Sequence, residues 1–123
     1  MKTIGIIGTR RRDSHEDFLK VRDVFMDVYQ AGDSVCSGLC SKGGDRFAVM
    51  LADEFKLPDN KRFWFPAEWK KYGKSAGFIR NTDIALTSDV LIACVSKDRT
   101  GGTEDTIRKF IKHKGCSNLM LVV

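Results

Sequence analysis

Short apolar runs alternate with amphipathic segments along the whole chain. Gly, Pro, Ser or Asp bounds each apolar run, a pattern typical of strands that are buried on both faces of a sheet. We therefore expect a sheet of about five strands. The five runs cover residues 3–8, 34–38, 62–66, 89–95 and 118–123.

The amphipathic segments predict helices. From residue 17 to residue 29 apolar side chains recur at helical spacing, and the residues just before supply N-cap chemistry, through Asp13 or Ser14 with Glu16 or Asp17. Apolar stripes at the same spacing indicate further helices. These are expected to begin near Asp45 and reach Phe55, to cover residues 75–86, and to include residues 107–111.

Strands that alternate with helices, without a linker or repeat, predict one α/β domain over residues 1–123. The expected fold is Rossmann-like and doubly wound, a mostly parallel sheet with helices on both faces. In such sheets ligands bind outside the carboxyl ends of the strands. The loops expected there cover residues 8–14, 37–45, 66–77 and 95–105, and they contain the glycine-rich and basic turns of the chain.

Composition narrows the class of protein. The 123 residues are 42% hydrophobic and 30% charged, which is globular composition. No segment approaches the roughly 20 apolar residues of a membrane span, and the first residues lack the features of a signal peptide. We expect a soluble, cytoplasmic protein with no membrane partner.

Cysteine and histidine spacing gives no reason to expect a metal or another cofactor. The four cysteines form no CxxC pair, and two of them lie in predicted strands, so we expect reduced core thiols. His15 and His113 lie far from any cysteine cluster. The cysteines are Cys36, Cys40, Cys94 and Cys116.

The loop after the first strand begins with Gly8, Thr9 and Arg10. A glycine lets backbone amides approach a ligand, and Thr and Arg can donate hydrogen bonds to phosphate oxygens. The three glycines of the dinucleotide-binding fingerprint are missing. A tight turn followed by exposed arginines explains this loop equally well.

Two later loops end in glycines that lead into helices, where free N–H groups and the helix dipole favour an anion. The first holds Gly38, Gly43 and Gly44; it is not a P-loop, because Lys42 precedes the glycines. Asp45, which follows, is interpreted as a structural cap, although it is also a candidate ligand contact. The second loop holds Gly101, Gly102 and Thr103.

Glu104 and Asp105 follow Thr103 and are candidate catalytic acids. Acids are also common in the first turn of a helix because they complement its dipole, and we favour that interpretation. In the third loop, Trp69 either stacks on a base at the mouth of a pocket or packs in the core. Trp64 and Phe65 are expected to be core residues.

Residues 66–85, PAEWKKYGKSAGFIRNTDIA, together with the motifs GTR, GGDRFA and GGTEDT, resemble the SLOG superfamily of Rossmann-like nucleotide-ligand domains, especially its YspA-like branch. The resemblance covers nearly the whole chain. It implies a pocket for a nucleotide or nucleotide-derived molecule, with phosphate on residues 101–103 and with Arg80 and Asn81 approaching from a helix. Without it, Arg80 and Asn81 would be surface residues of an amphipathic helix.

The superfamily also implies two alternatives. Lonely Guy phosphoribohydrolases cleave the N-glycosidic bond of nucleoside monophosphates, but their catalytic Glu lies three positions after the motif threonine, where this chain has Thr106. DNA-processing protein A binds single-stranded DNA, and the net charge of +5 is compatible with that but modest. A homo-oligomer is expected, since SLOG proteins often oligomerise and the apolar C-terminal strand would lie at a sheet edge.

Overall fold

The computed structural model describes all residues from 1 to 123 and contains one five-stranded sheet, in which all strands are parallel. The strand order is β3-β2-β1-β4-β5. This confirms a Rossmann-like, doubly wound α/β fold, and the sheet is wholly rather than mostly parallel. The strands are β1 (Thr3–Gly8), β2 (Ser34–Ser37), β3 (Arg62–Trp64), β4 (Val90–Cys94) and β5 (Leu119–Val122).

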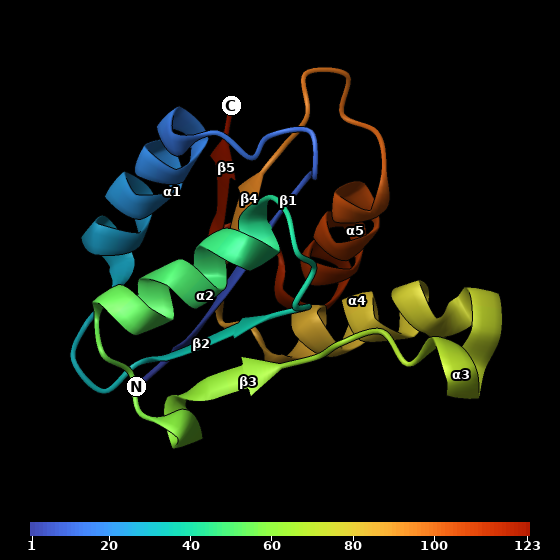
Figure 1. Cartoon of the computed structure of the whole chain (residues 1–123), viewed down its shortest axis with the longest axis horizontal. Coiled ribbons are helices and arrows are strands. Elements are labelled where there is room, and N and C mark those ends of the chain that lie inside the picture. The colour runs from blue at the N-terminus through green and yellow to red at the C-terminus, as the bar shows by residue number, and fades with distance from the viewer.

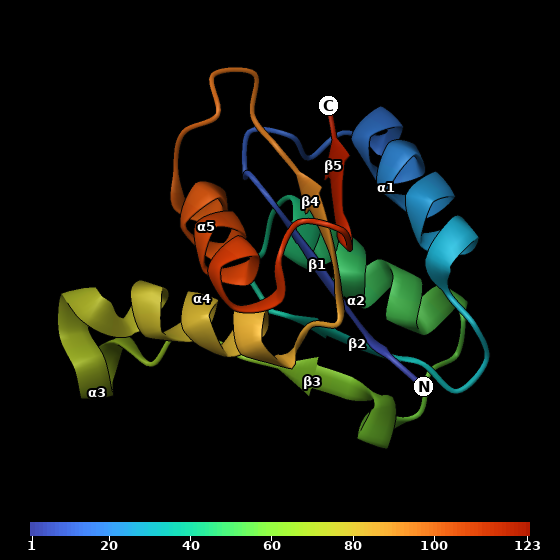
Figure 2. The ribbon, with the colours of Figure 1, turned by 180° about the vertical axis from the view of Figure 1, so that it is seen from behind.

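Helices cover both faces of the sheet (Figures 1 and 2). The first pair, α1 (His15–Val28) and α2 (Gly44–Glu54), packs on one face around a core that includes Phe25 and Phe47. The second pair, α4 (Ala76–Thr87) and α5 (Gly102–Lys114), encloses a smaller core on the other face. Three short elements complete the chain: α3 (Trp69–Tyr72) and the 3-10 turns η1 (Asp59–Lys61) and η2 (Gly73–Ser75).

The predicted helices are confirmed to within a few residues at each end. Helix α1 begins with a capping box, in which the Ser14 hydroxyl accepts a hydrogen bond from the Asp17 N–H and the Asp17 carboxylate accepts one from the Ser14 N–H. Helix α3 was not predicted, because its four residues are too few to show a helical period.

Burial of the strands on both faces is confirmed only for the centre of the sheet. Every residue of β2 and β4 is buried, whereas the edge strands β3 and β5 expose Phe63 and Leu121. The reason is that an edge strand has a neighbour on one side only and lies where the helices cover less of the sheet. The expected edge position of the C-terminal strand is confirmed, while self-association stays a prediction.

All four cysteines are free thiols. Cys36 and Cys94 are buried core residues, as expected, and burial raises the pKa of Cys36 to about 11. Cys40 and Cys116 are not core residues, since both lie in loops that solvent reaches. None of the helices combines the length and apolar character that crossing a membrane requires.

Candidate functional site

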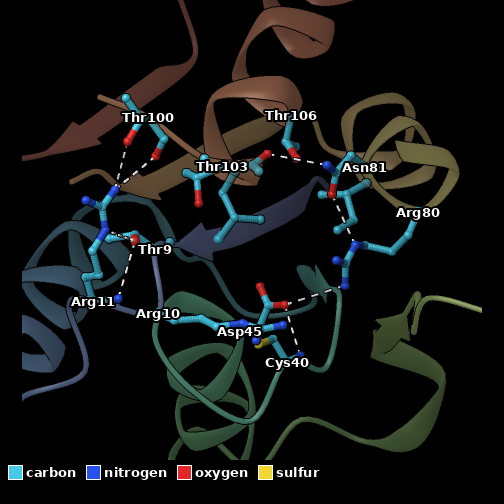
Figure 3. Close-up of a pocket in the computed structure, with 15 residues that line it drawn as sticks. Thr9, Arg10, Arg11, Cys40, Asp45, Arg80, Asn81, Thr100, Thr103 and Thr106 are labelled. Carbon is cyan, nitrogen blue, oxygen red and sulfur yellow. Dashed lines mark hydrogen bonds and ion pairs between the residues drawn. The ribbon is translucent and has the colours of Figure 1, made fainter. Parts of the chain in front are cut away.

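The sheet reverses its strand order between β1 and β4, and a cleft of about 390 Å³ lies at the carboxyl ends of these strands. This switch point is where doubly wound folds bind ligands. Nine of the predicted site residues line the cleft, and Figure 3 shows the labelled ones converging from the loop after β1 and from helices α2, α4 and α5. They are Gly8, Thr9, Arg10, Asp45, Arg80, Asn81, Gly101, Gly102 and Thr103.

The start of α5 forms an open wall of the cleft. The N–H groups of Gly102 and Thr103 have no hydrogen-bond partner within the protein. Gly101 has a φ of +106°, a backbone conformation that favours glycine. Gly102 has no such positive φ, and a Cβ atom on Gly102 would meet nothing within 4 Å. Neither backbone conformation nor packing therefore requires glycine at position 102, and its backbone lies open to a ligand.

The start of α2, in contrast, is closed by the protein itself. A Cβ atom on Gly44 would overlap the backbone of Ile7 and Gly8, so glycine is needed for the helix to approach β1. The N–H of Gly43 donates to the Asp13 carboxylate at 2.6 Å. The N–H groups of Gly44 and Asp45 have no hydrogen-bond partner within the protein either, so this helix start differs from that of α5 in being buried, and an anion at this second start stays a prediction. Gly43, like Gly38, lies outside the cleft lining.

Three arginines line the cleft and differ in their partners. Arg11 makes two hydrogen bonds of 3.0 Å to the Asp98 carboxylate and also contacts Thr100. Hydrogen bonds from Arg11, Ser96 and Thr100 lower the pKa of Asp98 well below its usual range. Arg10 is exposed and takes part in no ion pair. Its charge is therefore available to an anion.

Arg80 is not a surface residue, because only 19% of its side chain is exposed. Its Nη1 donates to the carbonyl oxygen of Gly38 at 3.1 Å and lies 3.9 Å from the Asp45 carboxylate, while its Nε donates to the Asn81 side-chain oxygen. A Cβ atom on Gly38 would overlap the Arg80 guanidinium. Gly38 therefore serves the site indirectly, by admitting Arg80.

Asp45 is not the cap of α2, since the N-cap is Gly43 and makes no side-chain cap hydrogen bond; Asp45 lies in the first turn and also lines the cleft. Its carboxylate accepts hydrogen bonds from the Ser37 hydroxyl at 2.8 Å and the Cys40 N–H at 3.0 Å, which hold the glycine loop in place. Burial raises the pKa of Asp45, although these hydrogen bonds and Arg80 act against the rise. It is the one carboxylate in the lining.

Glu104 and Asp105 lie outside the cleft lining. Glu104 pairs with Arg99, and Asp105 pairs with Lys109 at 2.8 Å. Thr106, where the SLOG resemblance would place the acid of a phosphoribohydrolase, does line the cleft and is only 2% exposed. On the α5 side this position therefore offers a hydroxyl and no carboxylate.

Trp69 lies neither in the core nor in the cleft, since it is 58% exposed on α3. Trp64 and Phe65, expected in the core, are only partly buried and pack against the two core clusters without belonging to them. Sequence reasoning missed several lining residues, although Arg11 and Thr100 stand in loops that it had singled out. The missed residues are Ile7, Arg11, Cys40, Ile84, Thr100 and Thr106.

Comparisons of the chain with protein-family models, with curated proteins and with solved structures find no match.

Proposed function

We propose that this protein binds a nucleotide or nucleotide-derived ligand, with a phosphate group seated at the start of α5. The observation that carries the proposal is the meeting of unpartnered donors and an unpaired cation in one cleft: the N–H groups of Gly102 and Thr103, and the side chain of Arg10. A phosphate oxygen accepts hydrogen bonds from backbone amides at a helix start, and the helix dipole adds to the attraction.

Two further points support the proposal. The cleft occupies the switch point of a doubly wound sheet, which is the usual ligand site of such folds. The motifs that resemble the SLOG superfamily supply most of its polar wall, including Arg80 and Asn81, and we propose membership of that superfamily. We also propose a cytoplasmic location, where four free thiols stay reduced.

Binding is favoured over N-glycosidic hydrolysis, because both candidate acids are engaged in ion pairs outside the cleft. Single-stranded nucleic acid is a weaker candidate. The cleft of about 390 Å³ lies within the usual size range for small-molecule sites, roughly 300–1,000 Å³. None of the 15 residues that line the cleft is aromatic, so the cleft itself offers no ring on which a base of a strand could stack.

Calorimetry with ribose 5-phosphate and a panel of nucleoside phosphates tests the proposal. We expect wild-type protein to bind phosphate-bearing ligands, and Gly102→Ala to weaken that binding because the new methyl group occupies open space beside the donors. Gly77→Ala is the matched control, since Gly77 also lies near a helix start but outside the cleft, and its Cβ would make only an ordinary contact with Trp69.

If Gly102→Ala and Gly77→Ala weaken ligand binding equally, this result would contradict a phosphate site at the start of α5. The complete absence of binding across the panel, by protein that unfolds cooperatively on heating, would contradict the proposed function altogether. Arg10→Ala gives a second test of the same seat. We compare it with Lys112→Ala, which removes the same charge from an exposed position outside the cleft.

A further inference from the structure

A second cavity, of about 200 Å³, adjoins the proposed phosphate site. It is formed by the end of β3 and the segment after it, together with α3 and α4. Arg80 lines both cavities and is the one residue that they share. Together they enclose about 600 Å³, which falls within the roughly 300–1,000 Å³ of small-molecule sites.

The two cavities differ in chemistry. The difference lies in the residue types: three of the 15 residues that line the main cleft are hydrophobic and three are arginines, whereas five of the nine that line the second cavity are hydrophobic. Two of these, Tyr72 and Ile79, are exposed and belong to neither core cluster, so core packing does not account for them. The apolar wall consists of Trp64, Phe65, Pro66, Tyr72, Ala76 and Ile79.

The charged groups of the second cavity, apart from Arg80, are the carboxylates of Glu68 and Asp83. Neither takes part in an ion pair. Carboxylates repel a phosphate but accept hydrogen bonds from amino groups. The charges therefore favour one orientation of a bound molecule. Its phosphate lies in the main cleft, and a neutral ring that bears amino groups lies in the second cavity.

We propose that the second cavity receives the amino-bearing base of the nucleotide whose phosphate is seated at the start of α5. The base stacks against the aromatic wall that includes Tyr72, and its amino group faces Glu68 and Asp83. Arg80, which the two cavities share, lies beside the sugar that joins the two ends of the ligand. This inference rests on the proposed function and adds to it a preference among bases.

Three ligands separate the contributions of ring, amino group and phosphate: ribose 5-phosphate, purine riboside 5′-monophosphate and AMP. We expect wild-type protein to bind AMP about tenfold more tightly than ribose 5-phosphate, a factor that corresponds to about 1.4 kcal/mol and lies within the range for stacking one base. Purine riboside 5′-monophosphate, which lacks the amino group of AMP, should bind with intermediate affinity.

Tyr72→Ala should remove most of the advantage of AMP and leave the affinity for ribose 5-phosphate unchanged, whereas Tyr72→Phe keeps the ring and the advantage. The double substitution Glu68→Gln, Asp83→Asn should bring AMP and purine riboside 5′-monophosphate closer together. Phe78→Ala is the control, because Phe78 is an exposed aromatic residue of α4 that lies outside both cavities.

Equal affinity of wild-type protein for AMP and ribose 5-phosphate would overturn the inference and leave the proposed function standing, provided that Gly102→Ala still weakens both. The inference is also wrong if Tyr72→Ala weakens ribose 5-phosphate as much as AMP, or if Phe78→Ala has the same effect as Tyr72→Ala. Failure of all three ligands to bind would overturn both the inference and the proposed function.

Discussion

The side-chain amide of Asn81 holds the first residue of α5, because its nitrogen donates a hydrogen bond of 3.3 Å to the carbonyl oxygen of Gly102. The same nitrogen donates to the Asp105 carboxylate at 3.2 Å, and the amide oxygen accepts from the Arg80 Nε at 3.1 Å. One buried amide thus connects α4, the start of α5 and an arginine of the cleft (Figure 3).

Replacing Asn81 should therefore affect stability and ligand binding together. We expect Asn81→Ala to lower the free energy of unfolding by about 1–3 kcal/mol, since it leaves partly buried polar groups without partners. Binding of ribose 5-phosphate should weaken as well, because the start of α5 loses its link to α4. Urea titration and calorimetry measure the two effects. Thr82→Ala, at the next position of the helix, is the control, and equal effects of the two variants would contradict this role of Asn81.

A methyl group should destabilise the protein at the glycine-rich start of α2 but not at that of α5. Gly44→Ala is expected to destabilise the fold by about 1–3 kcal/mol or more, because the Cβ atom would overlap the backbone of Ile7. Gly102→Ala should change stability by no more than about 0.5 kcal/mol, since its Cβ meets nothing. Urea titrations of both variants check this, and a stable Gly44→Ala variant would show that α2 can move away from β1.

The element order could be predicted from the sequence because buried strands and amphipathic helices have different periods. For that reason the central strands were predicted correctly, and so were the loops at their carboxyl ends. Helix α3 and the exposure of Phe63 were missed. A single turn has no period, and whether a strand lies at an edge depends on its neighbours in space.

The candidate site was predicted less completely, because its details depend on contacts between distant segments. Gly44 and Gly102 each follow a glycine and begin a helix, yet only Gly102 is exposed, and the difference arises from the packing of α2 on Ile7. Arg10 and Arg11 are neighbours in a basic run. Arg11 forms hydrogen bonds with Asp98, which is distant in the sequence, whereas Arg10 has no such partner.

Acid should weaken the fold through Asp33, whose buried carboxylate accepts hydrogen bonds from the Lys2 N–H, the Lys2 ammonium and the Gln30 N–H. Burial raises the pKa of Asp33, but these hydrogen bonds outweigh it and lower the pKa below its ordinary value of 3.8. The folded pKa lies below the unfolded one, so the stabilisation is complete above the unfolded pKa and is lost as the pH falls through the folded pKa.

We expect Asp33→Asn to lower the free energy of unfolding by about 1–3 kcal/mol at pH 7, because its amide NH2 would face donors of Lys2 and Gln30. The difference in the free energy of unfolding between wild type and variant should become smaller below pH 4. Urea titrations at several pH values measure it. A gap that stays constant from pH 7 into that acid range would show that the charge of Asp33 contributes nothing.

Incubation with AMP should release no free base. Glu104 and Asp105 are paired with Arg99 and Lys109 outside the cleft, and at Thr106, where the resemblance would place the acid, the cleft has a hydroxyl. Chromatography compares wild-type protein with the Glu104→Ala, Asp105→Ala double variant, and both should give the level of the buffer blank. Release of adenine by the wild type alone would restore hydrolysis as the function.

The last prediction concerns the pair of Arg80 and Asp45, whose charged groups lie 3.9 Å apart in the wall of the cleft. The partial burial of Arg80 means that removing it affects folding, in contrast to a surface arginine. Burial already raises the pKa of Asp45, and Arg80 opposes that rise. Arg80→Ala should therefore raise the pKa of Asp45 further and leave a buried carboxylate without its counter-charge.

The sign of the pH dependence follows from this. A carboxyl group whose folded pKa lies above its unfolded value stabilises the fold at low pH, and that stabilisation is lost as the pH rises through the folded pKa. The loss of stability in Arg80→Ala should thus be smallest near pH 4, close to the ordinary Asp value of 3.8, and should grow to about 1–3 kcal/mol at pH 7. Adding Asp45→Asn to Arg80→Ala should remove this growth, because the carboxyl group that titrates is gone.

Urea titrations of the single and double variants from pH 4 to pH 7 test this prediction. If Arg80→Ala loses the same free energy of unfolding across that range, Arg80 acts through its hydrogen bond to Gly38 rather than through Asp45.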